Sequence, residues 1–570
     1  MVVLVTACGP SGGDDDSGDA GNGSPIVSLI VEPPDPVLVS VNGSTPAATF
    51  TARATYEDGT SALVSANWAL SDIALGSLGA DNGEFVSGGI KAGAATVSAT
   101  VGTTTAETSL TVRVEDEIVG EGVPADVADR FTDPQPGAGS ANVLYPLNGA
   151  MLPSSIKPVH IQWDVGNADD LYRVTITAGL ATTTAYLLHS GAAFDFAWMV
   201  DPDSWRRIKN SRDATPITIV VDRYDSAASM AYASAAVGVN MVNANLDGAI
   251  YYWDLAQGKM LRITEEGRED FMPSPPASPD TGSRCIACHT VSRDGRYLAG
   301  ELWGGNQPGA IFDLSADLSV DPAPTVVGPG NYTALFSTFS PDASQLLINY
   351  AKTMELRDAM TGALIPTTGL PTTGAAHPTW SPDGTLIAYI ANSDGTWAVD
   401  FTVGDLAILP VNGTDFGPSQ TLWSADGMAN AWPSFSPDSQ WIAFGRGTNS
   451  RARRDDIGAV YPGSLFLTSR SGGQPVALAN ANGGALDSYL PNFSPFNSGG
   501  YYWLAFYSTR DYGNAQVGTR GSARRQLWVT AVSNNPQPGV DPSNVGFWLP
   551  DQDVSSDNMS AYWAPRPPVD

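Results

Sequence analysis

Two cysteines and a histidine form the pattern with the clearest chemistry in this chain. Cys285 and Cys288 stand three positions apart, and His289 follows directly. Two thiols at this spacing can form thioethers with both vinyl groups of one porphyrin, and the adjacent imidazole can bind the iron as its proximal ligand. The chain has only 3 Cys and 4 His, so random placement would produce the pattern on the order of 10⁻⁴ times. The motif therefore predicts one covalently attached haem c.

The same spacing also occurs in thiol–disulfide redox pairs and in halves of zinc sites. A structural zinc site needs four ligands, and no second cluster of Cys or His lies near residues 285–289 in the sequence. A redox pair usually opens a helix within a βαβ unit, and the surrounding residues lack that pattern. Both alternatives stay open, and haem attachment is the favoured interpretation.

The third cysteine, Cys8, ends a short apolar stretch. Residues 4–8 read Leu-Val-Thr-Ala-Cys, which resembles the bacterial lipobox, where small residues precede a cysteine that becomes lipidated. The residues that follow, 9–24, are rich in Gly, Ser and Asp, a composition typical of a flexible tether. The resemblance implies lipidation at Cys8.

The leader before Cys8 has no basic segment and is shorter than a working signal peptide. Either the true start lies upstream, or Cys8 ends a chance apolar stretch. Haem attachment of this kind occurs outside the cytoplasm, so export is expected independently. With Gly9 rather than Asp after the cysteine, we expect an outer-membrane lipoprotein facing the periplasm or the cell surface, held to the membrane by its lipid anchor only.

Composition limits the remaining function classes. The 570 residues include 29 basic and 59 acidic ones, for a net charge of −30. Such a surface repels nucleic acid, so we expect no nucleic-acid partner. No later stretch has 18 uninterrupted apolar residues, so no transmembrane helix is expected. Hydrophobic residues make up 42% of the chain, enough to build cores without disulfides.

The first half of the chain has the alternation typical of β-sandwiches. Residues 95–101 read Ala-Thr-Val-Ser-Ala-Thr-Val, and a period of two indicates strands with one buried face. The span 25–115, which includes Trp68, resembles bacterial Ig-like domains of group 2, which usually act as spacers. We expect a linker over 116–140 and a second sandwich, fibronectin- or Ig-like, over 141–245.

One unit recurs from residue 246 onward: an aromatic or apolar residue, a turn of the Ser-Pro-Asp type, then an apolar strand. The turn serines are spaced by 48, 41, 55 and 58 residues, which is the size of a propeller blade. The repeat resembles the TolB-like or PD40 β-propeller, whose signature is an aromatic residue followed by Ser-Pro-Asp-Gly. The five turn serines are Ser292, Ser340, Ser381, Ser436 and Ser494.

A sixth blade is expected from the two ends of this region. Residues 251–253 (Tyr-Tyr-Trp) and 261–264 (Leu-Arg-Ile-Thr) supply its outer strands, and residues 562–565 supply its inner strand. Their pairing closes the ring and removes exposed sheet edges. The predicted architecture is all-β: two β-sandwich domains followed by a six-bladed TolB-like β-propeller over 246–568.

Aligning the blades on their turn serines places Cys288 at the start of an innermost strand, at one mouth of the central channel. The equivalent positions in the other blades are Phe336, His377, Trp432, Leu490 and Ser560. Long loops of the later blades are expected on the same face and carry two groups of arginines, which could pair with haem propionates. These arginines are Arg451, Arg453 and Arg454 in one loop and Arg520, Arg524 and Arg525 in the other.

The second axial ligand of the iron is open at this point. His377 is the only other histidine of the propeller, and the register puts it on the same face as Cys288. Met272 precedes the motif and is the alternative, while Met428 and Met559 are expected near the same mouth. A vacant or water-bound position is the third outcome.

These observations support three function classes. The favoured one is an extracytoplasmic, membrane-tethered mono-haem cytochrome that transfers electrons to a redox partner that the sequence does not identify. A haem-dependent oxidoreductase or peroxidase is the alternative, so enzymatic activity stays open. The third is a propeller scaffold that binds protein or glycan. No catalytic triad or nucleotide-binding loop is recognisable, and a propeller fold assigns no function by itself.

Overall fold

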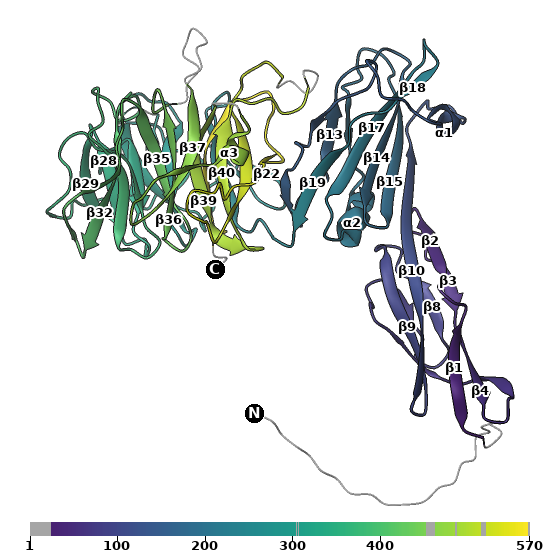
Figure 1. The fold of residues 1–570 in the computed structure, drawn as a ribbon. Helices are drawn as coiled ribbons and strands as arrows, with labels where there is room; N and C mark the ends of the chain where they lie inside the picture. Colours follow the sequence, from purple (N-terminus) through teal and green to yellow (C-terminus); the bar gives the residue numbers. More distant parts are fainter. Residues whose placement is uncertain are drawn as a thin grey trace, which may run out of the picture. The chain divides into compact units, whose positions relative to one another are not determined.

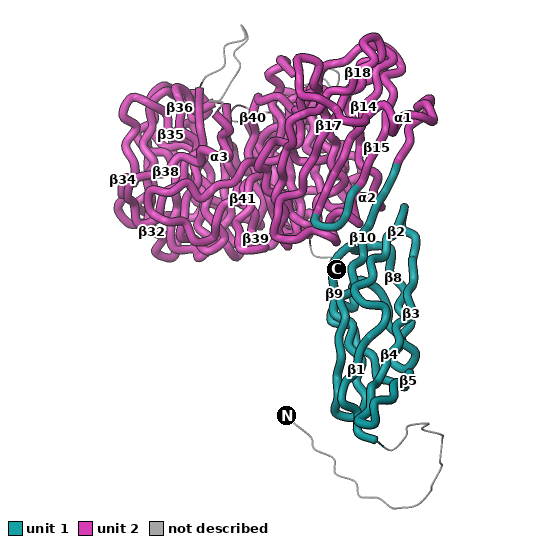
Figure 2. Tube along the Cα trace, turned by 45° about the vertical axis from the view of Figure 1, so that its right-hand side comes forward, with its two compact units in different colours: residues 1–117, 179–182 teal, residues 118–178, 183–570 magenta. Residues whose placement is uncertain are grey.

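The computed structural model describes residues 24–303, 305, 307–451, 462–484, 487–514 and 520–567. These residues form 43 strands and three short helices (Figure 1), so the predicted all-β class is confirmed. The chain divides into two compact units, drawn in different colours in Figure 2. Unit 1 contains residues 1–117 and 179–182, and unit 2 contains residues 118–178 and 183–570. Cys8 lies outside the described residues.

Unit 1 is a β-sandwich whose core follows the alternation of its strands. In β4 (Thr51–Tyr56) every second side chain is buried, because alternate residues of a strand point to opposite faces. Of these side chains, Ala52 packs with Phe50, Trp68 and Phe85 in one core. The sheets are ordered β1-β4-β5, β3-β8-β7 and β6-β9-β10-β2. The other strands are β1 (Ile26–Glu32), β2 (Val37–Val41), β3 (Ala47–Thr49), β5 (Ser61–Val64), β6 (Asn67–Leu70), β7 (Gly76–Leu78), β8 (Glu84–Ser87), β9 (Gly93–Val101) and β10 (Thr104–Val119).

A second sandwich begins unit 2. Its sheets are ordered β12-β19-β17-β14-β15 and β11-β13-β16, with Trp163, Tyr172 and Trp205 fully buried. Residues 116–140, expected as a linker, contain the end of β10 and the short helix α1 (Val127–Arg130). The other elements are β11 (Val143–Tyr145), β12 (Met151–Pro153), β13 (His160–Trp163), β14 (Leu171–Ala178), β15 (Ala181–Leu188), β16 (Ala197–Met199), α2 (Pro202–Ser211), β17 (Ile217–Asp225), β18 (Met230–Tyr232) and β19 (Val237–Val242).

Six further sheets form a β-propeller. Each inner strand contacts the inner strand of the next sheet, and the last, β43 (Asn558–Ala564), contacts the first, β23 (Ile286–Val291), so the ring is closed. The remaining inner strands are β27 (Phe336–Phe339), β30 (Ala376–Trp380), β35 (Ala429–Phe435) and β39 (Ser488–Ser498).

The predicted closure of the sixth blade is confirmed. β20 (Ala249–Asp254) pairs antiparallel with β43, and Tyr251 lies opposite Tyr562. This blade is ordered β22-β21-β20-β43, with β21 (Lys259–Ile263) and β22 (Arg268–Glu269) outside. The chain thus begins and ends its propeller within one sheet.

The other five blades are continuous in sequence. Their second and third strands are β24 (Tyr297–Leu302) and β25 (Gln307–Asp313), β28 (Gln345–Tyr350) and β29 (Thr353–Asp358), β31 (Leu386–Ala391) and β32 (Asp405–Asn412), β36 (Trp441–Gly447) and β37 (Gly463–Ser469), β40 (Tyr501–Ser508) and β41 (Gln526–Ser533). Outer elements are β26 (Thr333–Ala334), β33 (Asp415–Phe416), β34 (Gln420–Trp423), β38 (Val476–Ala477), α3 (Ala479–Asn482) and β42 (Phe547–Trp548).

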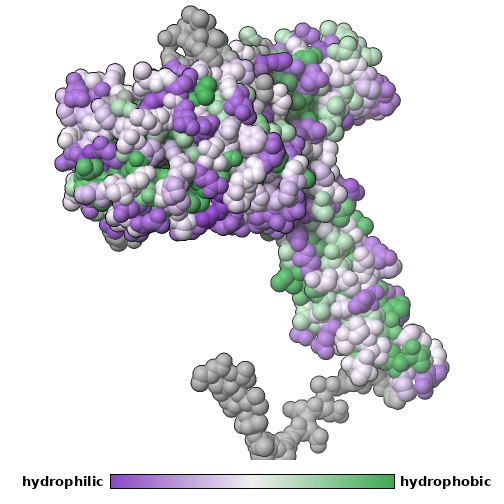
Figure 3. Space-filling model, turned by 60° about the vertical axis from the view of Figure 1, so that its left-hand side comes forward, coloured by the Kyte–Doolittle hydropathy of each residue, from purple (hydrophilic) through white to green (hydrophobic). Residues whose placement is uncertain are grey.

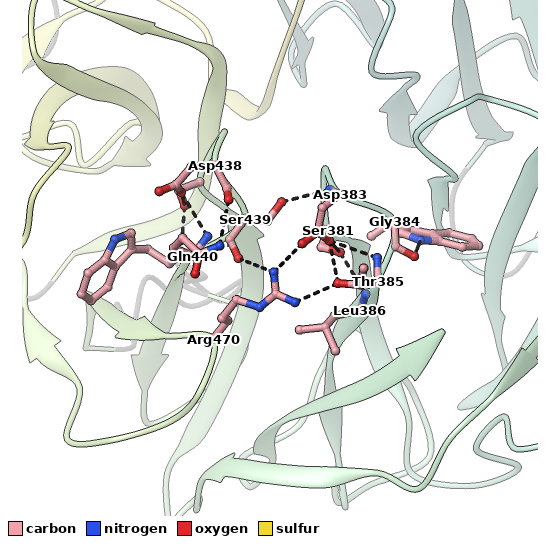
Figure 4. Close-up of polar contacts among 12 residues, drawn as sticks. Ser381, Asp383, Gly384, Thr385, Leu386, Asp438, Ser439, Gln440 and Arg470 are labelled. Carbon is pink, nitrogen blue, oxygen red and sulfur yellow. Dashed lines mark hydrogen bonds and ion pairs between the residues drawn. The ribbon is translucent and has the colours of Figure 1, made fainter. Parts of the chain in front are cut away.

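The recurring Ser-Pro-Asp turn is explained by its hydrogen bonds (Figure 4). The Ser381 hydroxyl donates to the Asp383 carboxylate at 2.7 Å and accepts from the Leu386 N–H at 2.9 Å, which fixes the turn between β30 and β31. Arg470 of the next blade donates to Asp383 and to Thr385. The serine–aspartate bond recurs at Ser292, Ser340 and Ser436 and stabilises those hairpins as well, and at Asp383 the turn also joins two neighbouring blades.

On the face drawn in Figure 3, hydrophilic (purple), intermediate (white) and hydrophobic (green) residues are interspersed. Within the part of the chain that the structure describes, no helix is long and apolar enough to cross a membrane.

Candidate haem-binding cavity

A cavity of about 540 Å³ lies among the first residues of the inner strands of the propeller. This volume is within the range of about 300–1,000 Å³ typical of ligand and cofactor sites. Its walls include Trp253, Trp397 and Tyr562. All six positions aligned by the blade register also line it: Cys288, Phe336, His377, Trp432, Leu490 and Ser560.

A repeated β-bulge turns these side chains toward the cavity. In five of the inner strands the register with the neighbouring strand shifts at this position. The residue there has a positive φ, with values of 47° at Cys288, 49° at His377, 57° at Trp432, 51° at Leu490 and 57° at Ser560. A bulge re-aims one side chain without ending the strand. Such strained backbone in non-glycine residues clusters at functional sites.

The two cysteines of the motif are free thiols and differ in their surroundings. Cys288 lines the cavity, and burial together with the nearby Glu301 carboxylate holds the pKa of its thiol well above the ordinary value. Cys285 lies just before β23 and is not part of the cavity lining. Burial raises its pKa as well, and Trp253 and Glu301, which also act on this thiol, both line the cavity.

His289 also lines the cavity, and its ring is uncharged. Burial lowers its pKa to about 4, opposed by the Tyr251 carbonyl. Its Nε2 lies 3.3 Å from that carbonyl oxygen, which can only accept, so Nε2 carries the proton. Nδ1 is then unprotonated, and it is buried with no hydrogen-bond partner among the described residues. An unprotonated imidazole nitrogen is what a metal requires.

The donor set therefore fits haem attachment in chemistry, although the motif side chains do not converge on one point. Among the described residues, no three His, Cys, Asp or Glu side chains are grouped so as to hold a metal ion. Such a group is what a zinc site would need. Cys288 and His289 both line the cavity, and the buried Nδ1 of His289 has no hydrogen-bond partner among the described residues. Haem attachment would account for this combination.

The structure separates the two candidates for the second axial position. His377 lines the cavity, but its Nδ1 accepts a hydrogen bond from the Trp432 N–H at 3.3 Å, and its ring stacks on the Trp432 ring with centroids 3.5 Å apart. Its Nε2 is buried. Met272 is buried in another core with Phe271 and does not line the cavity. Met559, in β43, does line it.

Only some of the arginines predicted to face the haem line the cavity. Arg451 and Arg525 line the cavity, whereas Arg520 and Arg524 do not. The Nη1 atom of Arg520 instead lies 3.7 Å from the Oδ2 atom of Asp164, a residue of the second sandwich. Arg453 and Arg454 fall outside the described residues. Two of the six predicted arginines are therefore placed where they can meet an anionic group in the cavity.

Two polar residues of the lining escaped the sequence analysis. Glu301 is almost fully buried, and its carboxylate accepts from the N–H groups of Gly305 and Gln307 at 2.9 and 3.1 Å. Tyr507 is buried, and burial raises its pKa to about 12, opposed by Arg525 and then by Arg451. A glutamate inside the apolar strand 297–302 was the signal that could have revealed the first of these.

Two buried neutral histidines make the haem-free protein sensitive to acid. Burial is the main cause that lowers the pKa of His289 to about 4 and holds the pKa of His377 well below its ordinary value of 6.5. Between pH 6.5 and 4 the unfolded chain binds protons that the folded chain does not, so stability is complete above pH 6.5 and falls as the pH falls. For His289 alone the loss amounts to about 3 kcal/mol. Urea unfolding at several pH values checks this.

The comparison variant for this prediction is His377→Phe, which keeps an aromatic ring next to Trp432 and removes one titrating group. Its free energy of unfolding should fall less steeply between pH 6.5 and 4 than that of the parent protein. An identical pH dependence in both proteins would show that His377 has the same pKa in the folded and the unfolded chain, which would contradict the lowering of its pKa by burial.

No family model matches the chain, and no curated protein matches it in sequence. Solved structures with a similar fold include a chain of a nidogen/laminin complex, with 10% identity over 55% of this chain and 97% of that chain and a TM-score of 0.34. The propeller domain of Myceliophteria thermophila Cps50 (Swd1) has 10% identity over 45% of this chain and 82% of its own, with a TM-score of 0.26. Porphyromonas gingivalis dipeptidyl peptidase 4 has 12% identity over 44% and 38%, with a TM-score of 0.24. These likenesses carry no information about function.

Proposed function

We propose that this protein is an extracytoplasmic electron-transfer protein that carries one haem c in the cavity of its propeller. The observation that supports this most is that Cys288 and His289 of the motif line the same cavity as Arg451 and Arg525. Thiol, imidazole and guanidinium groups are the partners that the vinyl groups, the iron and the propionates of one haem require.

Each residue has a separate role in this proposal. Cys285 and Cys288 hold the cofactor by thioether bonds, and His289 binds its iron through an unprotonated nitrogen. The neutral state of His289 at physiological pH, which its lowered pKa ensures, keeps that nitrogen available. Trp253 and Trp397 shield the site from water. Haem c supplies one-electron exchange between ferric and ferrous iron.

Lipidation at Cys8 would tether the protein to the outer membrane, with the two sandwiches as spacers between the anchor and the propeller. This part of the proposal rests on the lipobox-like residues 4–8 and on the polar tract after them. The partner would be another redox protein, and the net charge of −30 favours one with a basic docking surface.

A spectroelectrochemical titration tests the electron-transfer function. The haem-loaded protein should pass reversibly between one oxidised and one reduced form, with a slope of about 59 mV per tenfold ratio for a one-electron couple. Fast consumption of hydrogen peroxide with a reducing substrate, together with poor reversibility, would replace electron transfer by peroxidase activity.

Electron transfer also needs a second axial ligand, and the cavity offers Met559 more readily than His377. Met559 belongs to β43, which contacts the strand that carries His289. To bind iron, His377 would have to leave both its hydrogen bond with the Trp432 main chain and its stacking on the Trp432 ring, whereas Met559 would have to leave only the contact of its sulfur with Arg525 Nη1. We expect that Met559→Leu makes the haem high-spin and open to carbon monoxide, while His377→Ala leaves the parent spectrum unchanged. Optical spectra of the reduced proteins with and without carbon monoxide check this.

The outcomes separate the alternatives. If His377→Ala makes the haem high-spin and Met559→Leu does not, His377 is the second axial ligand of the iron. Rapid carbon monoxide binding by the unmodified protein would mean a vacant position and would favour a haem oxidoreductase. That second function is supported by one observation: His377 is engaged by Trp432, whose N–H donates to its Nδ1 and whose ring stacks on its own.

A further inference from the structure

The lining of the cavity includes polar and charged side chains as well as apolar ones. Arg451 and Arg525 reach it from different blades, and Tyr507 lies in the lining with them. Both guanidinium groups act on the Tyr507 hydroxyl, where they lower a pKa that burial raises. Two cations and one phenol therefore belong to the lining of the same cavity.

Each arginine is held in place by a carboxylate that does not line the cavity. Arg451 lies 3.4 Å from Asp400 and has its guanidinium carbon 4.9 Å from the centroid of the Trp397 ring. Arg525 lies 3.5 Å from Asp557, and its Nη1 is 3.3 Å from the Met559 sulfur. Their side chains are only 23% and 15% exposed. Fixed, half-desolvated guanidinium groups are prepared to bind an anion at little entropic cost.

The two arginines of the cavity contrast with the negative charge of the protein as a whole. The whole chain carries −30, so an anion has no general attraction to its surface. The described lining of the cavity contains two arginines, each paired with a carboxylate outside the lining, and one carboxylate of its own, Glu301, which accepts from two backbone N–H groups. The rest of the wall is aromatic, with Phe336, Trp432 and Tyr562 among its residues.

We infer that Arg451, Arg525 and Tyr507 form a carboxylate-binding site for a ligand whose body is flat and apolar. The guanidinium groups and the phenol donate hydrogen bonds to the carboxylate, and the aromatic walls stack against the body. The inference concerns the polypeptide and does not depend on haem attachment. The carboxylate can belong to a haem or to a free aromatic acid, and the two sources share this chemistry.

The test uses the full chain with Cys285→Ala and Cys288→Ala, which cannot attach haem, and titrates it calorimetrically with 2-naphthoate. The neutral analogue 2-naphthylmethanol has the same rings and no carboxylate. The acid should bind, and the alcohol should bind at least about tenfold more weakly, because a charge-assisted hydrogen bond is lost. Equal binding of both compounds, or binding of neither, would overturn the inference.

Variants locate the site. In the same haem-free background, Arg525→Gln and Arg451→Gln should each weaken naphthoate binding about ten- to hundredfold. Arg525→Lys, which keeps the charge and loses the two-pronged donor, should give a smaller loss and controls for folding. Arg524→Gln is the matched control, since Arg524 is the neighbouring residue and does not line the cavity. An equal effect of the substitutions at 524 and 525 would overturn the assignment.

The haem-loaded parent protein then identifies the source of the carboxylate. If it no longer binds naphthoate, the site holds the carboxylates of the haem itself. If it still binds, the site takes a free aromatic acid beside the haem. Absence of covalent haem would remove the proposed function but would leave the results with the haem-free protein intact, so the two failures are distinguishable.

Discussion

Protein with both Cys285→Ala and Cys288→Ala should leave a haem-maturation system without covalently bound haem, while the unmodified chain carries one haem per molecule. The reason is that thioether bonds are the only covalent link that the motif can make to the porphyrin. Cys285 is buried and Cys288 is half-buried in the propeller. Alanine at these positions should change the free energy of unfolding only a little, whereas the loss of covalent haem should be complete. Haem staining after denaturing electrophoresis measures the effect.

The third cysteine provides the matched control for this prediction. Cys8→Ala should keep the full haem content and lose membrane attachment, because the lipobox-like segment assigns lipidation, not haem, to Cys8. The single variants at 285 and 288 should each keep the haem through one remaining thioether bond. Equal haem staining of the double variant and the parent would contradict the assignment of the motif.

Truncation after Asp557 should prevent the propeller from folding. It removes β43, which is both the inner strand of the sixth blade and the strand that joins the last blade to the first. Trp563 alone is 4% exposed and donates from its Nε1 to the Asp247 carbonyl at 2.9 Å. Losing one such buried aromatic costs about 3–5 kcal/mol, and a whole domain has only about 5–15 kcal/mol of stability. Loss of a whole strand of buried side chains exceeds that margin.

Near-ultraviolet circular dichroism and size-exclusion chromatography check this prediction. The truncated chain should lose the aromatic signal of its propeller, keep that of the two sandwiches, and aggregate, because β20 is left with an unpaired edge. The control is truncation after Pro567, which keeps β43 and should unfold as the complete protein does. A truncated chain that stays monomeric with an unchanged spectrum would show that closure through β43 is dispensable.

The repeats made the propeller predictable. The serine and aspartate of each Ser-Pro-Asp turn are short-range partners, as at Ser381 and Asp383, so the local sequence itself specifies the hairpin. The spacing of the turns then gives the blade size, and the register gives the cavity lining. This is why Phe336, Trp432 and Leu490 could be placed on one wall although 154 residues separate the first from the last (490 − 336).

The details of the site could not be predicted because they depend on contacts between blades. Adjacent residues in one loop, Arg524 and Arg525, have the same chemistry, and only the local path of the backbone decides which of them enters the cavity. The sequence suggests His377 as an iron ligand, but the N–H group that engages its Nδ1 comes from Trp432 in the next blade. Likewise, burial of Met272 with Phe271 is a property of the folded core.

Acid–acetone extraction of the haem-loaded, unmodified protein, followed by intact-mass measurement, tests the central claim most directly. The account predicts that the Soret absorbance stays with the polypeptide, that the mass exceeds the apoprotein by one haem, and that the peptide containing residues 285–289 carries the addition. Complete transfer of the colour to the organic phase, with an unmodified polypeptide mass, would contradict covalent attachment at Cys285 and Cys288.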